Sequence, residues 1–96
     1  MENREYICNL FDYYSQLLTD KQIQHFQDYY FDNLTLSEIS ENNNISRNAV
    51  HKTIKDAEEK LIFYEESLKL YSKSEEIKKI ISNLDIDLQN KIKELI

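Results

Sequence analysis

The side chains best suited to binding a ligand are gathered in one short segment, residues 46–55. Its polar members are Ser46, Arg47, Asn48, His51, Lys52 and Lys55. If the segment is a helix whose Val50 and Ile54 point into a core, helical periodicity turns these polar residues outward. Arginine and lysine contact phosphate groups or guanine, and asparagine pairs with the edge of adenine. The segment therefore has the composition of a helix that reads duplex DNA.

Charge sets this segment apart from the rest of the chain. The chain has 12 basic and 18 acidic residues and a net charge of −6, which does not suit a general polyanion binder. Residues 46–55 contain three basic residues and no acidic one, which leaves −9 for the remainder. The alternative interpretation is a solvated charged face, the usual role of charges on a surface helix. Three phosphate contacts predict weak binding by a monomer, because tight DNA-binding proteins use about 6 to 10.

Capping residues mark the helix boundaries in a chain that has no glycine and no proline. Two capping boxes, Thr19–Gln22 and Thr35–Glu38, pair a threonine with a glutamine or glutamate three residues later. Ser46 is a third N-cap, and apolar residues flank all three starts at the spacing of a hydrophobic staple. Ser72–Glu75 has the box pattern without the staple. These caps predict that helices begin directly after residues 19, 35, 46 and 72.

The segment that precedes the basic residues predicts a helix-turn-helix. A short helix over 37–42 is followed by a turn and by the capped helix at Ser46, which is the spacing of this motif. Ser40 supplies the small residue needed where the two helices touch, and Asn44 suits a left-handed backbone in the turn. Asn43 departs from the motif, which usually buries a leucine or phenylalanine there, and its amide needs hydrogen-bond partners.

Helical periodicity continues through most of the chain and predicts an all-α fold. An apolar stripe from Val50 to Tyr71 predicts a fourth helix over about residues 46–71, which is too long to stay inside a compact small domain. We therefore divide the chain into a helix-turn-helix domain, residues 1–71, and a C-terminal helical extension, residues 72–96. The apolar residues of the extension either pack back on the first two helices or, with the fourth helix, form the surface of a homodimer. Their spacing leaves both open.

Several kinds of chemistry lack the residues that they require. Phosphate-binding loops, dinucleotide fingerprints and nucleophile elbows need glycine, and the chain has none. Cys8, the single cysteine, allows neither an intrachain disulfide nor a thiolate zinc site and is expected to be a core thiol. His25, Asp28 and Asp32 share one helical face, but a solvated face with an incidental histidine is the simpler interpretation. We expect a cytoplasmic protein that is not an enzyme, takes no cofactor and does not insert into membranes.

Four segments give the chain a resemblance to a known family. Residues 17–22, 29–39, 45–50 and 64–71 are similar to the YlxM family of small bacterial helix-turn-helix proteins, which resemble region 4 of sigma factors. The resemblance covers about residues 5–75 and implies a sigma region 4-like bundle in a regulatory protein that binds duplex DNA. It also implies a link to the signal recognition particle pathway, because family members are typically encoded beside its genes. The alternative function is therefore an interaction module that binds a protein or RNA component of that particle.

Overall fold

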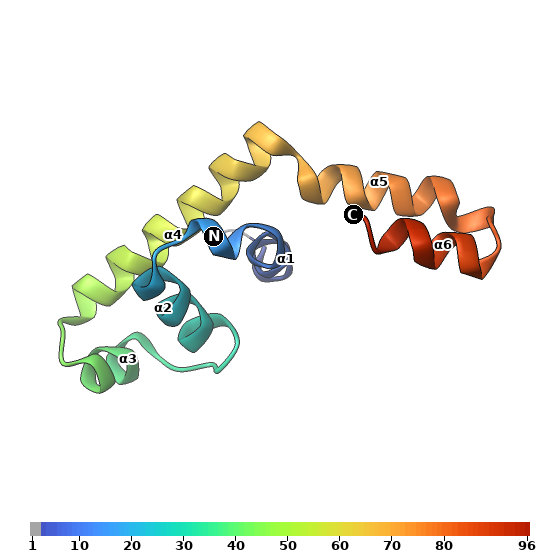
Figure 1. Cartoon of the computed structure of the whole chain (residues 1–96). Coiled ribbons are helices and arrows are strands. Elements are labelled where there is room, and N and C mark those ends of the chain that lie inside the picture. Colours follow the sequence, from blue (N-terminus) through green and yellow to red (C-terminus); the bar gives the residue numbers. More distant parts are fainter. Residues whose placement is uncertain (1–2) are drawn as a thin grey trace.

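Six α-helices make up most of residues 3–96, the part of the chain that the computed structural model describes (Figure 1). They are α1 (Arg4–Tyr14), α2 (Asp20–Tyr30), α3 (Leu36–Asn43), α4 (Arg47–Leu68), α5 (Leu70–Ile80) and α6 (Ile86–Lys93). Short 3₁₀ helices, η1 (Ser15–Leu17) and η2 (Ile81–Asn83), follow α1 and α5, and no strand occurs in this range. The prediction of an all-α fold is confirmed. No helix of residues 3–96 is both long and apolar enough to cross a bilayer.

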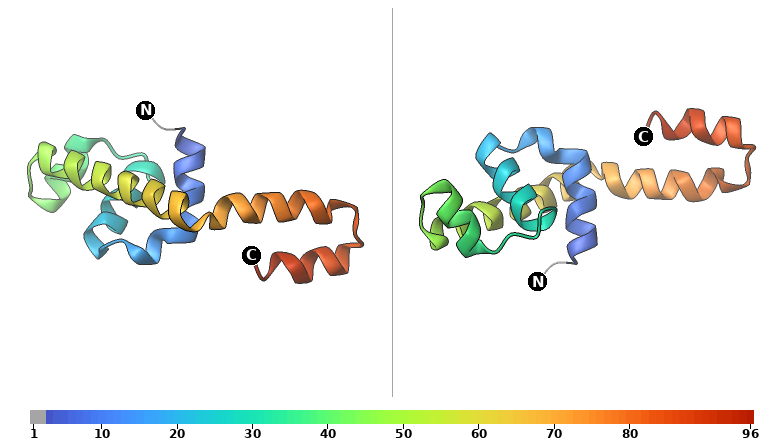
Figure 2. Two further views of the ribbon diagram at one scale, coloured as in Figure 1. Left: turned by 90° about the horizontal axis from the view of Figure 1, so that it is seen from above. Right: turned by 90° about the horizontal axis from the view of Figure 1, so that it is seen from below.

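The helices form two parts of different shape. The first three helices pack along α4 and enclose the core with it (Figure 1). Helices α5 and α6 run antiparallel and project beyond the end of α4 as a C-terminal hairpin, residues 70–96 (Figure 2). The molecule is therefore elongated, with extents of 52 × 25 × 23 Å.

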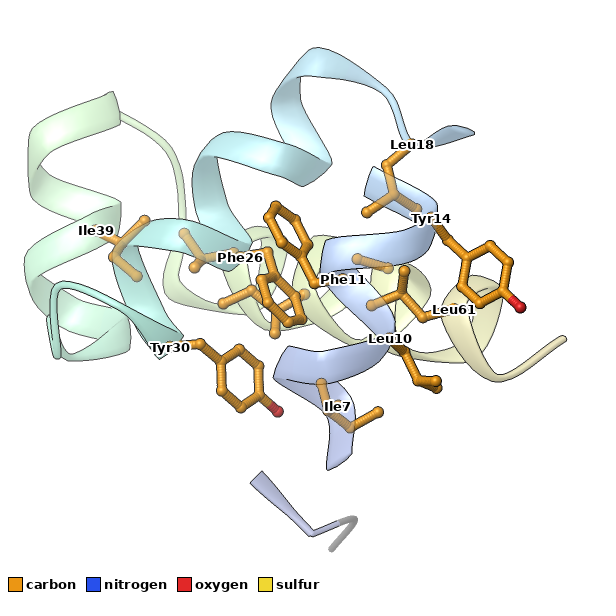
Figure 3. Close-up of a cluster of buried hydrophobic side chains, with 12 residues drawn as sticks. Ile7, Leu10, Phe11, Tyr14, Leu18, Phe26, Tyr30, Ile39 and Leu61 are labelled. Atoms are coloured by element: carbon orange, nitrogen blue, oxygen red, sulfur yellow. The ribbon is translucent and has the colours of Figure 1, made fainter. Parts of the chain in front are cut away.

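The core lies where α1 and α2 meet α4, and aromatic rings form its centre (Figure 3). Phe26 stacks on Phe11 with ring centroids 4.5 Å apart and on Tyr30 with centroids 4.4 Å apart. The buried apolar side chains of the core are Ile7, Leu10, Phe11, Tyr14, Leu18, Phe26, Tyr30, Ile39, Val50, Ile54, Ala57 and Leu61. Every one of the first four helices contributes to this set, so the helix-turn-helix is part of a single core.

The helix starts predicted at Thr19, Thr35 and Ser46 are confirmed. In α2 and α3 both hydrogen bonds of the capping box form. The threonine hydroxyl accepts from the backbone amide of the third helical residue, and the side chain of that residue accepts from the backbone amide of the threonine. Ser46 accepts from the amide of Ala49 at 3.0 Å. Local side chains therefore determine where α2, α3 and α4 begin.

The helix predicted over residues 46–71 is wrong at its C-terminal end, and the cap predicted at Ser72 is wrong as well. Helix α4 ends at Leu68, and Lys69 adopts a left-handed conformation with φ 57° and ψ 30°. Ser72 lies inside the first turn of α5 rather than before a helix. The chain therefore bends between α4 and α5 at Lys69, without the glycine or proline that usually indicates a bend in the sequence.

Glu65 and Tyr14 cap α5 in place of a local residue. The Glu65 side chain is 3% exposed, and its carboxylate accepts from the amides of Tyr71 (3.1 Å) and Ser72 (3.0 Å). The same carboxylate accepts from the hydroxyls of Tyr14 (2.6 Å) and Ser72. Tyr14 in turn accepts from the amide of Leu70 at 3.0 Å. Three amides that a helix N-terminus leaves without intrahelical partners are thereby satisfied, so α1 and α4 hold the bend in place.

Candidate nucleic-acid interface

Asn44 gives the turn between α3 and α4 its shape. Its backbone is left-handed, with φ 55° and ψ 42°, as predicted. The Asn44 amide donates to the carbonyl of Glu41 at 3.3 Å, and the Ile45 amide donates to the carbonyl of Ser40 at 3.1 Å. These bonds close the C-terminal end of α3, as left-handed helix caps do. Helices α3 and α4 therefore meet at a short turn in a helix-turn-helix arrangement (Figure 1).

Buried side chains hold α4 against the rest of the domain. Val50 and Ile54 are 0% and 5% exposed on its inner face, and Ile39 of α3 belongs to the same buried cluster. Asn43, which departs from the usual apolar residue, is half-buried, and its side-chain amide donates to the carbonyl of Ile39 at 2.8 Å. The side-chain amide of Asn43 therefore has a hydrogen-bond partner within α3, although the motif usually has an apolar residue at this position.

The outer face at the start of α4 carries the six predicted contact residues. Ser46, Arg47, Asn48, His51, Lys52 and Lys55 are all exposed. The C-terminal hairpin leaves the other end of α4 and covers none of this face (Figure 2). Lys52 forms an ion pair with Asp56 at 3.0 Å, whereas Arg47 and Lys55 have no ion pair within residues 3–96. The fold thus presents these side chains, with most of their donors directed to solvent.

Arg4 adds a positive charge beside this face that sequence reasoning missed. Arg4 and Arg47 line the same surface depression, between the end of α2 and the start of α3. The Arg4 guanidinium donates to the carbonyls of Tyr29 (3.0 Å) and Tyr30 (2.9 Å) and to the side chain of Asn33 (3.3 Å). These bonds fix its charge at the C-terminal end of α2, where the helix dipole favours a cation. No local pattern connects the two arginines in the sequence, because only folding brings them together.

The residues considered for metal or thiol chemistry lie on α1, on α2 and just after α2, and none of them is part of α4. His25 is buried, Asp28 is half-buried and Asp32 is exposed. In residues 3–96, no three histidine, cysteine or carboxylate side chains are placed to hold a metal ion. Cys8 is half-buried beside the core, and burial raises the pKa of its thiol although Arg4 opposes the shift. A raised pKa keeps Cys8 in its unreactive thiol form at neutral pH.

Buried His25 predicts a loss of stability in mild acid. Its Nδ1 atom has no hydrogen-bond partner in residues 3–96, and burial, followed by the nearby Lys21, lowers its pKa below the ordinary 6.5 although Asp28 opposes the shift. The unfolded chain therefore takes up a proton before the folded one, so stability is complete above pH 6.5 and falls below it, by at most about 1.4 kcal/mol per pH unit. Urea denaturation from pH 7.5 to 5 should show this slope, and His25→Leu should remove it.

The second histidine of the chain provides the control for this prediction. His51 is exposed on α4, so His51→Gln should keep the slope of the wild-type protein. An equal slope in the His25→Leu variant would show that another group causes the acid sensitivity.

Comparison with known proteins shows that the chain is similar to one family of helix-turn-helix proteins. Residues 1–96 match the family model UPF0122, described as "Putative helix-turn-helix protein, YlxM / p13 like". A UPF0122 protein of Clostridium acetobutylicum is 41% identical over 97 aligned positions, which cover 98% of this chain and 84% of the relative. A UPF0122 protein of Clostridium botulinum is 44% identical over 95% of this chain and 84% of its own length. A UPF0122 protein of Malacoplasma penetrans is 52% identical over 63 residues, 66% of this chain and 59% of the relative.

Proposed function

Since the chain belongs to the YlxM / p13-like helix-turn-helix family, we propose that it is a cytoplasmic regulatory protein that binds duplex DNA through α4. The observation that carries this proposal is the division of α4 into two faces. Val50 and Ile54 hold the helix to the core, while the predicted contact residues remain exposed on the opposite face. A helix held in this way can enter a major groove with its side chains free to meet base edges and phosphates.

Each exposed residue has a defined chemical role in this proposal. Arg47, Lys52 and Lys55 contact phosphates, and Arg47 is also near enough to the helix start to reach a guanine edge. Asn48 offers the paired donor and acceptor that match adenine, and His51 lies one turn further along. Ser46 uses its hydroxyl to cap α4. In this proposal it therefore stabilises the N-terminus of α4, which approaches the phosphate backbone of the DNA.

The same basic face could meet a component of the signal recognition particle instead of DNA. Duplex geometry favours DNA, because the major groove of an RNA helix is deep and narrow and does not admit an α-helix. The RNA alternative therefore becomes one arm of the experiment. If the protein binds an RNA hairpin tightly and a DNA duplex only weakly, the signal recognition particle alternative replaces the present proposal.

Fluorescence anisotropy with a labelled DNA duplex at low salt tests the proposal. We expect the wild-type protein to bind with a Kd of about 10⁻⁴ to 10⁻⁶ M at physiological salt, the range of non-specific duplex binding, and more tightly at low salt. The variant Arg47→Ala/Lys52→Ala/Lys55→Ala should bind weakly, and the slope of log K against log salt should become shallower by about 0.9 for each lost phosphate contact.

A variant with the same change of charge elsewhere separates a site from a general effect of charge. Lys21, Lys73 and Lys79 are exposed on α2 and α5, so Lys21→Ala/Lys73→Ala/Lys79→Ala removes three positive charges away from α4. This control should retain most of the affinity and slope of the wild-type protein. Equal losses in the two triple variants, or no duplex binding by the wild-type protein at low salt, would refute the proposal.

A further inference from the structure

The exposed apolar side chains of the protein are concentrated on the C-terminal hairpin. Ile80 is 70% exposed, Leu88 is 46% exposed and Leu95 is 84% exposed. Within residues 70–96, Ile81 is the one apolar side chain that is buried. A pair of short helices with so little core of its own gains further stability when another surface covers it. The hairpin therefore presents a surface that the rest of this protomer does not bury.

Three of these side chains share one side of the hairpin. Leu88 lies on α6, and Leu95 lies two residues beyond its last residue, Lys93, at the seven-residue spacing that continues the same helical face. Because α5 and α6 run antiparallel (Figure 2), helical periodicity assigns Ile80 of α5 to the same side as these two leucines. We call Ile80, Leu88 and Leu95 the hairpin face. Ile86 is 63% exposed but lies on the opposite side of α6, half a helical turn from Leu88.

The charges of α6 match those of an antiparallel copy of the same helix. Residues 70–96 contain five lysines and five acidic residues, so the net charge of −6 lies entirely in residues 1–69. Helix α5 has no acidic residue in its first turn, because Lys73 precedes Glu75 and Glu76, and its last turn is basic. Helix α6 is different, because Asp87 makes its first turn acidic and Lys91 and Lys93 make its last turn basic.

A helix that is acidic at its start and basic at its end is complementary to an antiparallel copy of itself. A two-fold axis perpendicular to the helices creates that pairing, because the same patch then meets itself in the reverse direction. Nucleic acid would gain little from a surface without net positive charge.

We propose that a second copy of this chain covers the hairpin face, so that two C-terminal hairpins form a four-helix bundle. The 11 residues of α5 span about 16 Å, which makes the contact smaller than the roughly 800 Å² per partner of a standard interface. The dimer is therefore a weak one that forms in the micromolar range. It leaves both copies of α4 uncovered, since the hairpin projects from the other end of that helix (Figure 1).

Sedimentation velocity of the full chain over a wide range of concentration tests this proposal. We expect the wild-type protein to change from monomer to dimer as its concentration rises through roughly 10 to 500 µM. The variant Leu88→Glu/Leu95→Glu should stay monomeric throughout, because carboxylates on the hairpin face would be buried without partners. Far-UV circular dichroism shows whether the variant keeps its helices.

The chain offers a matched control for the hairpin face. Ile86→Glu puts a carboxylate on the same helix but on its other side, and this variant should dimerise as the wild-type protein does. The proposal is overturned if the wild-type protein is monomeric at every concentration, if Leu88→Glu/Leu95→Glu dimerises normally, or if Ile86→Glu abolishes the dimer equally. A monomer that still binds duplex DNA would overturn this proposal and leave the proposed function intact.

Discussion

Replacing Glu65 with alanine is expected to lower the free energy of unfolding by about 3 kcal/mol. The buried carboxylate accepts four hydrogen bonds that join Tyr14 of α1 to the start of α5. Without it, the amides of Tyr71 and Ser72 lose their partner, and so does the hydroxyl of Tyr14, which is buried. Urea denaturation monitored by far-UV circular dichroism at neutral pH measures the loss.

Glu66 provides the control for this substitution because it is the next residue along α4 and is exposed. Glu66→Ala should change the free energy of unfolding by no more than about 0.5 kcal/mol. Glu65→Gln should fall between the two, since an amide oxygen can accept some of the same bonds while its NH₂ group faces other donors. Equal unfolding midpoints for Glu65→Ala and Glu66→Ala would contradict the structure of this network.

The pH dependence of stability gives a second measure of the same network. Burial alone raises the pKa of Glu65, but bonds from the Ser72 and Tyr14 hydroxyls and from two backbone amides outweigh burial and lower the pKa below 4.5. The folded carboxylate therefore resists protonation more than the unfolded one. Its contribution to stability is complete above about pH 4.5 and is lost as the pH falls from there through the folded pKa. Glu65→Ala should lack this acid-dependent loss, whereas Glu66→Ala should retain it.

The same network explains which helix ends could be predicted from the sequence. The starts of α2, α3 and α4 depend on side chains within three residues of the helix, so the pattern of capping residues is sufficient to find them. The bend at Lys69 depends on Tyr14. Its hydroxyl accepts a hydrogen bond from the amide of Leu70, which is 56 residues away in the sequence. A left-handed lysine carries no sequence signal, and the apolar stripe continues through it. The domain boundary at residues 71 and 72 stays a prediction, and the bend lies just before it.

The candidate interface was predictable to the extent that it is confined to one helix. Periodicity alone assigns Val50 to the core and Arg47 to the surface, and the structure agrees. Arg4 escaped prediction because its place beside Arg47 follows from the packing of α1 against the end of α2. Neither the resemblance nor helical spacing carries that information, since both describe residues that are close in the sequence.

Replacing Phe26 with alanine is expected to have the largest effect on stability, a loss of about 3–5 kcal/mol. Phe26 is fully buried and stacks on both Phe11 and Tyr30, so its removal opens a cavity between α1 and α2. A domain of this size has a total stability of about 5–15 kcal/mol, so the variant would have little margin left. Urea denaturation at low temperature measures the loss, and Phe63→Ala is the control because Phe63 is 63% exposed.

A milder change at Phe26 distinguishes residues that stabilise the core beneath α4 from residues that contact DNA. Phe26→Leu keeps part of the apolar volume and should leave the protein folded in dilute buffer with a lowered unfolding midpoint. Because Phe26 lies in the core and not on the outer face of α4, this variant should bind duplex DNA as the wild-type protein does. Arg47→Ala should show the opposite pattern, with weaker binding and an unchanged midpoint. A Phe26→Leu variant that is folded yet binds weakly would mean that the core sets the geometry of the contact, beyond holding α4 in place.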